Sequence, residues 1–206
     1  MSKRAVGVGH KTPPDYELAG HWQINLKGWA LVVLAAGAVI VFGLTIILGV
    51  VARGILQGST DFHVSVGLAF PIFLAIIAAV LILHEGVHGL VFLVFGGKPR
   101  FGVKLIGRFF PVAFYASATG YILSRNHYLL VGLAPFLVLT PLFLLTGILI
   151  RDDGVALIAL MTMAMNIAGS TGDFIVARKV RQLGGRTLFE DTADGFNWYR
   201  PSGPNL

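Results

Sequence analysis

The stretch of sequence that decides the fold covers residues 64–97 and reads VSVGLAFPIFLAIIAAVLILHEGVHGLVFLVFGG. Over these 34 residues the only ionisable side chains are those of His84, Glu85 and His88. An α-helix rises 1.5 Å per residue and the hydrocarbon core of a bilayer is about 30 Å thick, so about 20 apolar residues cross it. We therefore expect a membrane-spanning helix longer than one crossing needs, accommodated by tilt, by a kink near Pro71 or by extension beyond the bilayer.

Three further stretches have the same apolar character. Residues 28–52 and 128–150 carry no charge, and residues 154–177 carry one, at Asp173. The whole chain of 206 residues is 55% hydrophobic and 13% charged, which is too apolar for a soluble domain of this size. The sequence therefore predicts a multi-pass integral membrane protein with four spans, surrounded by the lipid bilayer.

The basic residues sort by membrane side. Lys and Arg accumulate in the cytoplasmic segments of membrane proteins. Fourteen of the sixteen lie in three segments that a four-span chain places on one side, namely residues 1–27, 98–126 and 178–206, and the exceptions are Arg53 and Arg151. Both termini are therefore expected in the cytoplasm. The net charge of +6 becomes a signal of topology, so nucleic acid is not expected as a partner.

The predicted fold class is an all-α membrane protein, a four-helix transmembrane bundle, with a small β-hairpin in the cytoplasmic loop 98–126. The hairpin is predicted because residues 101–105 and 112–116 alternate partly between apolar and other side chains. The expected organisation is a cytoplasmic leader at 1–27, a membrane domain at 28–180 and a cytoplasmic tail at 181–206. The end of the tail, residues 189–206, is expected to lie on the membrane surface or to be loosely ordered, without chemistry of its own.

The chain has no cysteine, so a metal site must use His, Asp or Glu. His84 and His88 are four residues apart, which places both on one face of a helix and lets both bind one zinc ion. Glu85 then lies beside the ion, where it can take a proton from a zinc-bound water and pass it to a leaving amine. Ionisable residues within a span are costly and usually mark function. The motif therefore predicts a zinc site with Glu85 as the catalytic base.

A catalytic zinc site usually has three protein ligands, so one more is needed. Asp173 is the candidate, because it lies five residues before Arg178 and His88 lies ten before Lys98, depths that agree to within a couple of helical turns. Asn166, Ser170 and Asp173 also form one polar stripe at helical spacing. Two alternatives remain open: an ion pair of Asp173 with Arg178 or Lys179 at the membrane surface, and His127 as the third ligand.

These motifs resemble the site-2 protease group, and more closely a small bacterial membrane family described as "putative zincin peptidase". The resemblance rests on the His84–His88 motif, the following basic loop, Leu133-Ala134-Pro135, and the pattern from Asn166 to Asp173. It implies that His84, His88 and Asp173 bind zinc, that Glu85 is the general base, and that Asn166 and Ser170 contact the substrate. The sequence departs from the usual Leu-Asp-Gly context of site-2 proteases at Gly172-Asp173-Phe174.

The function expected is a zinc-dependent endopeptidase that cleaves a membrane protein or peptide within or beside the membrane. The protein would lie in the bacterial cytoplasmic membrane with its active site toward the cytoplasm. One alternative is a zinc-binding sensor or scaffold without hydrolytic activity. Another is an ion transporter, which the lack of an inverted repeat disfavours.

Overall fold

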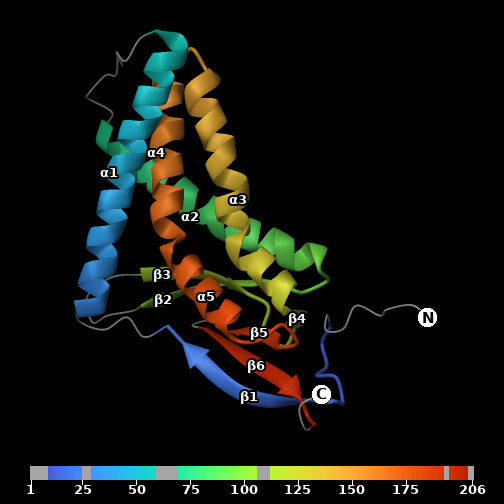
Figure 1. The fold of residues 1–206 in the computed structure, drawn as a ribbon. Helices are drawn as coiled ribbons and strands as arrows, with labels where there is room; N and C mark the ends of the chain where they lie inside the picture. The colour runs from blue at the N-terminus through green and yellow to red at the C-terminus, as the bar shows by residue number, and fades with distance from the viewer. Residues whose placement is uncertain (1–8, 25–28, 59–68, 106–111, 193–194, 204–206) are drawn as a thin grey trace. The chain divides into compact units, whose positions relative to one another are not determined.

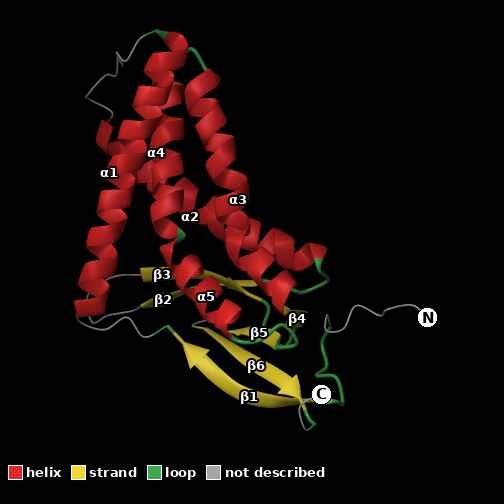
Figure 2. Cartoon of the chain, in the orientation of Figure 1, coloured by secondary structure: helices red, strands yellow, loops and turns green. Residues whose placement is uncertain are grey.

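The computed structural model describes residues 9–24, 29–58, 69–105, 112–192 and 195–203 (Figure 1). The elements in chain order are β1 (Tyr16–Gln23), α1 (Trp29–Gln57), α2 (Ala69–Val94), β2 (Arg100–Leu105), β3 (Val112–Ser117), β4 (Ile122–Ser124), α3 (Arg125–Leu149), α4 (Asp153–Gly169), α5 (Thr171–Gln182), β5 (Leu188–Thr192) and β6 (Gly195–Pro201). Figure 2 separates these helices from the strands. The structure is mostly helical, as predicted, but it has more strands than the hairpin expected in 98–126, because strands also form near both ends of the described chain.

The prediction of four spans is confirmed as far as length and composition decide it. Within the part of the chain that the structure describes, four helical stretches are long and apolar enough to cross a membrane: Ala35–Gln57, Phe73–Val94, Arg125–Leu149 and Asp153–Gln182. Large apolar side chains are exposed along them, including Val39, Ile55 and Val94. Apolar surface of this extent is a liability in water but is the surface that lipid requires.

The fourth stretch is interrupted, which the sequence did not predict. α4 ends at Gly169, Ser170 forms its C-cap, and α5 begins at Thr171. The Ser170 hydroxyl donates to the carbonyl of Asn166 at 2.9 Å, a contact four residues back that tends to bend helices. Asp173 therefore lies in the first turn of α5, just after a break within the apolar stretch Asp153–Gln182.

The end of α1 is tied to the connection between α3 and α4. The buried Arg53 guanidinium donates to the carbonyl of Ile150 at 2.5 Å and forms a 2.7 Å salt bridge with Asp153. The last carbonyls of a helix have no donor within the helix, so an arginine here satisfies them. The Gln57 amide adds a 2.6 Å bond to the carbonyl of Ile148. The end of α1, the end of α3 and the start of α4 thus lie together. This is expected when α4 runs antiparallel to both α1 and α3.

Close packing beside α4 depends on two glycines. A Cβ at Gly49 of α1 would lie 2.7 Å from the Leu160 side chain of α4, and one at Gly147 of α3 would lie 2.6 Å from it. Any larger residue would therefore displace Leu160, which is fully buried. Small residues at such points let helix backbones approach each other in membranes.

The larger sheet joins segments from both ends of the chain. Its strand order is β1-β6-β5-β4, with antiparallel pairing throughout. Residues from the predicted leader thus pair with residues from the predicted tail. The alternative of a loosely ordered tail is wrong for residues 189–192 and 195–201, which lie in β5 and β6, and a position on the membrane surface stays a prediction. The first two residues of each strand are buried, and Phe189 and Phe196 among them belong to an aromatic core that includes Phe92 and Tyr128.

The predicted hairpin is confirmed. β2 and β3 form a two-stranded antiparallel sheet in which Phe101 pairs with Ala116 and Val103 with Phe114. The connection at residues 106–111 lies outside the described residues. Phe101 and Val103 are exposed, and a Cβ on Gly89 of α2 would lie 2.5 Å from the Phe101 ring. The Phe101 side chain of the hairpin therefore lies against α2, the helix that carries the histidines.

The chain divides into two compact units. The strand unit comprises residues 1–25, 85–134 and 173–206 and contains all the described strands. The helix unit comprises residues 26–84 and 135–172 and contains α1, α4 and most of α2 and α3.

Candidate metal centre

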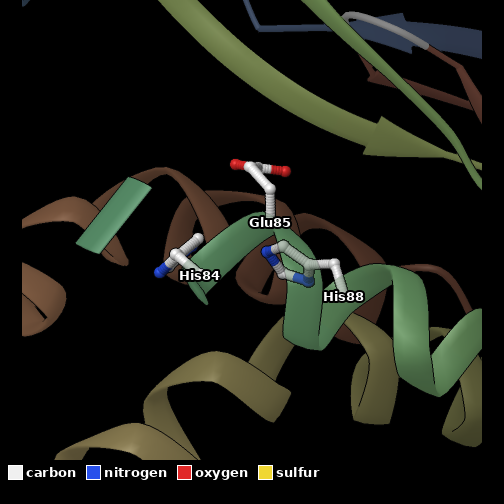
Figure 3. A group of neighbouring side chains, drawn as sticks. All are labelled: His84, Glu85 and His88. Atoms are coloured by element: carbon white, nitrogen blue, oxygen red, sulfur yellow. The ribbon is translucent and has the colours of Figure 1, made fainter. Parts of the chain in front are cut away.

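The motif His84-Glu85-Gly86-Val87-His88 lies on α2, which runs without interruption through it. One ligand atom from each of His84, Glu85 and His88 lies within 4.8 Å of the others. Figure 3 shows the three side chains leaving neighbouring positions of the helix. Both histidines are buried, as expected of polar groups in an apolar helix whose exposed side faces lipid. The helix alone therefore brings together three groups that can hold or serve a metal ion.

His84 is oriented by a side chain of α4. Its Nδ1 lies 3.0 Å from Oδ1 of Asn166. An amide oxygen only accepts hydrogen bonds, so Nδ1 carries the proton and donates it. The lone pair of the neutral ring is then on Nε2. A histidine that binds a metal through one nitrogen commonly donates the other N–H to such an acceptor, and this is the arrangement of His84.

The orientation of the Asn166 amide follows from its other contacts. Its Nδ2 donates to the carbonyl of Pro135 at 3.2 Å and to the Thr140 hydroxyl at 3.1 Å. Because the carbonyl of Pro135 can only accept, the NH₂ group must face it and the oxygen must face His84. Asn166 is fully buried. It therefore connects α3 and α4 to the first histidine, all within the helix unit.

His88 is oriented by the backbone of α3. Its Nδ1 lies 2.9 Å from the carbonyl oxygen of Val131, which can only accept. Nδ1 therefore donates here too, and the lone pair of the neutral ring is again on Nε2. The freed carbonyl is available because Pro135, four residues later, has no N–H to offer it. A proline inside α3 thus creates the acceptor for the second histidine.

Asp173 approaches the same nitrogen of His88. Its Oδ1 lies 3.6 Å from Nε2 of His88. Two ligands of a tetrahedral zinc ion with bonds of about 2.0–2.1 Å lie about 3.3 Å apart, so this separation is near the one required. Asp173 comes from the first turn of α5, in the strand unit.

These donors fit zinc. Among the described residues the group that could hold a metal comprises His84, Glu85 and His88, and the place of Asp173 as third ligand stays a prediction. Two neutral imidazoles and one carboxylate would be nitrogen and oxygen ligands of the kind found in catalytic zinc sites, which keep a fourth position for water. Glu85 is also close enough by distance to be a ligand. However, successive side chains on a helix point about 100° apart. The Glu85 side chain therefore points away from the direction of His84 and lies beside the two histidines.

The remaining predicted site residues lie as follows. Ser170 is fully buried and donates to the helix carbonyl of Asn166. The oxygen of Asn166 accepts from His84, and its NH₂ group donates to Pro135 and Thr140, so both polar groups already have partners within the protein. The substrate-binding roles of both stay predictions. His127, the alternative ligand, lies against the ring of Phe95 at 4.5 Å, and among the described residues its ring belongs to no metal-binding group.

Other groups near the site were not found by sequence reasoning. Val131 and Pro135 contribute backbone carbonyls, which no side-chain pattern reveals. Tyr128 donates to Asp191 of β5 at 2.7 Å, a contact 63 residues apart in sequence. Asp191 stands in a strand that was not predicted. Residues 188–192 read LFEDT and do not alternate between apolar and polar side chains, so the sequence carried no clear signal for this strand.

No curated protein and no solved structure matches this chain. Residues 76–186, more than half of the chain, match the model of a family described as "Putative zincin peptidase". The matched range includes the histidine motif and extends past Asp173. The chain belongs to this family, which indicates a zinc metallopeptidase.

Proposed function

We propose that the protein is a zinc-dependent endopeptidase that hydrolyses a peptide bond within or beside the membrane, near its cytoplasmic face. The observation that carries the proposal is the setting of His88. The Val131 carbonyl holds its Nδ1, and the Asp173 carboxylate lies 3.6 Å from its Nε2. His84, with its Nδ1 held by Asn166, supplies the third ligand. Family membership supports the same chemistry.

The division of labour between the two carboxylates follows from their positions. Asp173 faces the lone pair of a histidine and acts as a ligand. Glu85 lies beside the histidines on the same helix and acts as the general base. When bound, zinc supplies the Lewis acidity that makes water a nucleophile near neutral pH and polarises the scissile carbonyl. Glu85 takes the proton from the attacking water and returns it to the leaving amine.

The hairpin of β2 and β3 offers an edge that could bind the substrate in an extended conformation. A peptide bond inside a helix is shielded by its own hydrogen bonds, so a helical substrate must be extended before attack. An extended peptide can add to the edge of a sheet through backbone hydrogen bonds. The hairpin lies next to the motif through the contact of Phe101 with Gly89. Val103→Pro should therefore lower turnover and leave zinc content intact, and unchanged turnover would contradict this role.

Cleavage is tested directly with the purified full chain and a library of fluorogenic peptides with apolar sequences, in water enriched with oxygen-18. Hydrolysis places the heavy oxygen in the new carboxylate, which mass spectrometry detects. We expect cleavage by the wild type and a loss of about 10²–10⁴-fold in Glu85→Gln, with zinc content unchanged. Absence of cleavage by the wild type, with zinc bound, would favour the zinc-binding sensor or scaffold instead.

The proposed orientation is testable because the chain has no cysteine. Ser202→Cys places a thiol after β6, and Arg151→Cys places one between α3 and α4, both at exposed positions. A membrane-impermeant maleimide added to intact cells should label the thiol at position 151 and spare the one at position 202. Labelling of only the thiol at position 202 would reverse the topology.

A further inference from the structure

Asp191 is an acidic side chain that the proposed reaction does not use. It lies on β5, on the same face of the strand as the fully buried Phe189. Its cross-strand partner is Phe196, which is also fully buried. A carboxylate on the core face of a sheet is costly unless it has hydrogen-bond partners. Burial raises the pKa of the Asp191 carboxyl to about 7, although the hydroxyl of Tyr128 acts in the opposite direction.

The partner of Asp191 is held in one place. Tyr128 is buried at the start of α3, and its hydroxyl donates to Oδ1 of Asp191 at 2.7 Å. Its ring stacks on Phe189, with centroids 5.4 Å apart and planes 13° apart, and meets the ring of Phe196 edge-on at 5.8 Å. The two aromatic contacts fix the ring, and the carboxylate fixes its hydroxyl.

Tyr128 and Asp191 are connected to the metal centre through one helical turn. Tyr128 precedes Val131 by three residues, so both lie on the same face of α3. The carbonyl of Val131 is the acceptor that orients His88. The Asp191 carboxyl also lies within electrostatic range of His88, Glu85 and Asp173, which influence its pKa. All of these residues belong to the strand unit.

We propose that Asp191 and Tyr128 form a positioning pair for the metal centre: the β5 carboxylate anchors the Tyr128 hydroxyl and so holds the turn of α3 whose Val131 carbonyl orients His88. This rests on the proposed zinc site. The C-terminal strands then contribute to the site through Asp191, which lies beyond the residues that match the family.

The pair is tested by zinc affinity, measured by chelator competition on the purified full chain. The variants are Asp191→Asn, Tyr128→Phe and the double variant. The matched control is Glu190→Gln, on the opposite face of the same strand, where the carboxylate accepts from Gly120, Asn197 and Tyr199. We expect each single variant to raise the zinc dissociation constant about tenfold, the lower limit for groups that orient a ligand. The double variant should add little, because both changes remove the same contact.

A second readout separates positioning from general loss of stability. The visible spectrum of cobalt bound in place of zinc reports the geometry of its ligands. It should change in Asp191→Asn and Tyr128→Phe and stay as in the wild type in Glu190→Gln. Wild-type zinc affinity and cobalt spectra in the first two variants, or equal changes in Glu190→Gln, would overturn the proposal. Because neither readout involves cleavage, a protein that binds zinc in this way without hydrolysing peptides would contradict only the proposed function.

Discussion

The two histidines of the motif are held in different ways. His84 donates to the side chain of Asn166 in the helix unit, whereas His88 donates to the backbone carbonyl of Val131 in the strand unit. A side-chain acceptor can be removed by one substitution, but a backbone carbonyl stays whatever residue stands there. The orientation of His84 therefore depends on the identity of one residue, and that of His88 depends on the placement of a helical turn.

The largest difference between the two is expected from removing each support. Asn166→Ala deletes the acceptor of His84, and we expect the zinc dissociation constant to rise 10- to 100-fold. Val131→Ala keeps the carbonyl and removes only buried methyl groups, so the constant should change less than about threefold while the protein becomes less stable. Both are measured by chelator competition. Equal effects of the two substitutions would break the distinction between a side-chain support and a backbone support.

A smaller effect, on stability alone, is expected at the far end of the helix unit. Arg53→Met removes the donor to the final carbonyls of α3 and the partner of Asp153. We expect a loss of about 2–3 kcal/mol in the free energy of unfolding, because buried acceptors lose a charged donor. Thermal unfolding in detergent measures the loss. Zinc affinity of the folded variant should remain that of the wild type, since Asn166 is supported by Pro135 and Thr140. A fall in zinc affinity would mean that the orientation of His84 depends on the packing of the whole helix unit.

The smallest effect is expected on the outer face of the larger sheet, in the strand unit. Burial acts to raise the pKa of Glu190, but its hydrogen bonds from Tyr199, Asn197 and Gly120 outweigh it and lower the pKa below the ordinary value. A carboxylate with a lowered pKa stabilises the fold above its unfolded pKa, and that contribution disappears as pH falls through the folded value. Glu190→Gln should thus flatten the decline in stability below about pH 4.5, by less than about 1 kcal/mol because the group is only partly buried and solvent screens it. Unfolding midpoints from pH 3 to pH 7 measure it, and an unchanged slope would contradict the assignment.

Most of the helical framework could be predicted from the sequence, because an uncharged stretch of more than about 20 residues has few alternatives to a span. The histidine motif could also be predicted, since its spacing is a property of a single helix. The break at Ser170 could not, because nothing in the residues from Asn166 to Asp173 distinguishes a capped helix end from a polar stripe. The larger sheet was missed because β1, β5 and β6 are short and find their partners at the other end of the chain.

The supports of the two histidines also differ in how far the sequence reveals them. Asn166 stood out in the sequence as a polar residue in an apolar helix, although its contact with His84 was not foreseen. The acceptor of His88 was invisible, because a carbonyl is present at every position. In the sequence Pro135 stood out only as part of Leu133-Ala134-Pro135, yet its missing N–H frees the carbonyl of Val131. Such contacts require the three-dimensional structure.

The central claim is that His84, His88 and Asp173 together hold one zinc ion, and metal analysis of the purified chain tests it most directly. Wild type, His84→Ala and Asp173→Ala are purified in parallel, with Arg53→Met as a control for altered stability, and their zinc content is measured by mass spectrometry. The wild type and Arg53→Met should each retain about one zinc ion per chain, and both ligand variants should lose most of it. Equal zinc content in all four proteins would contradict the claim.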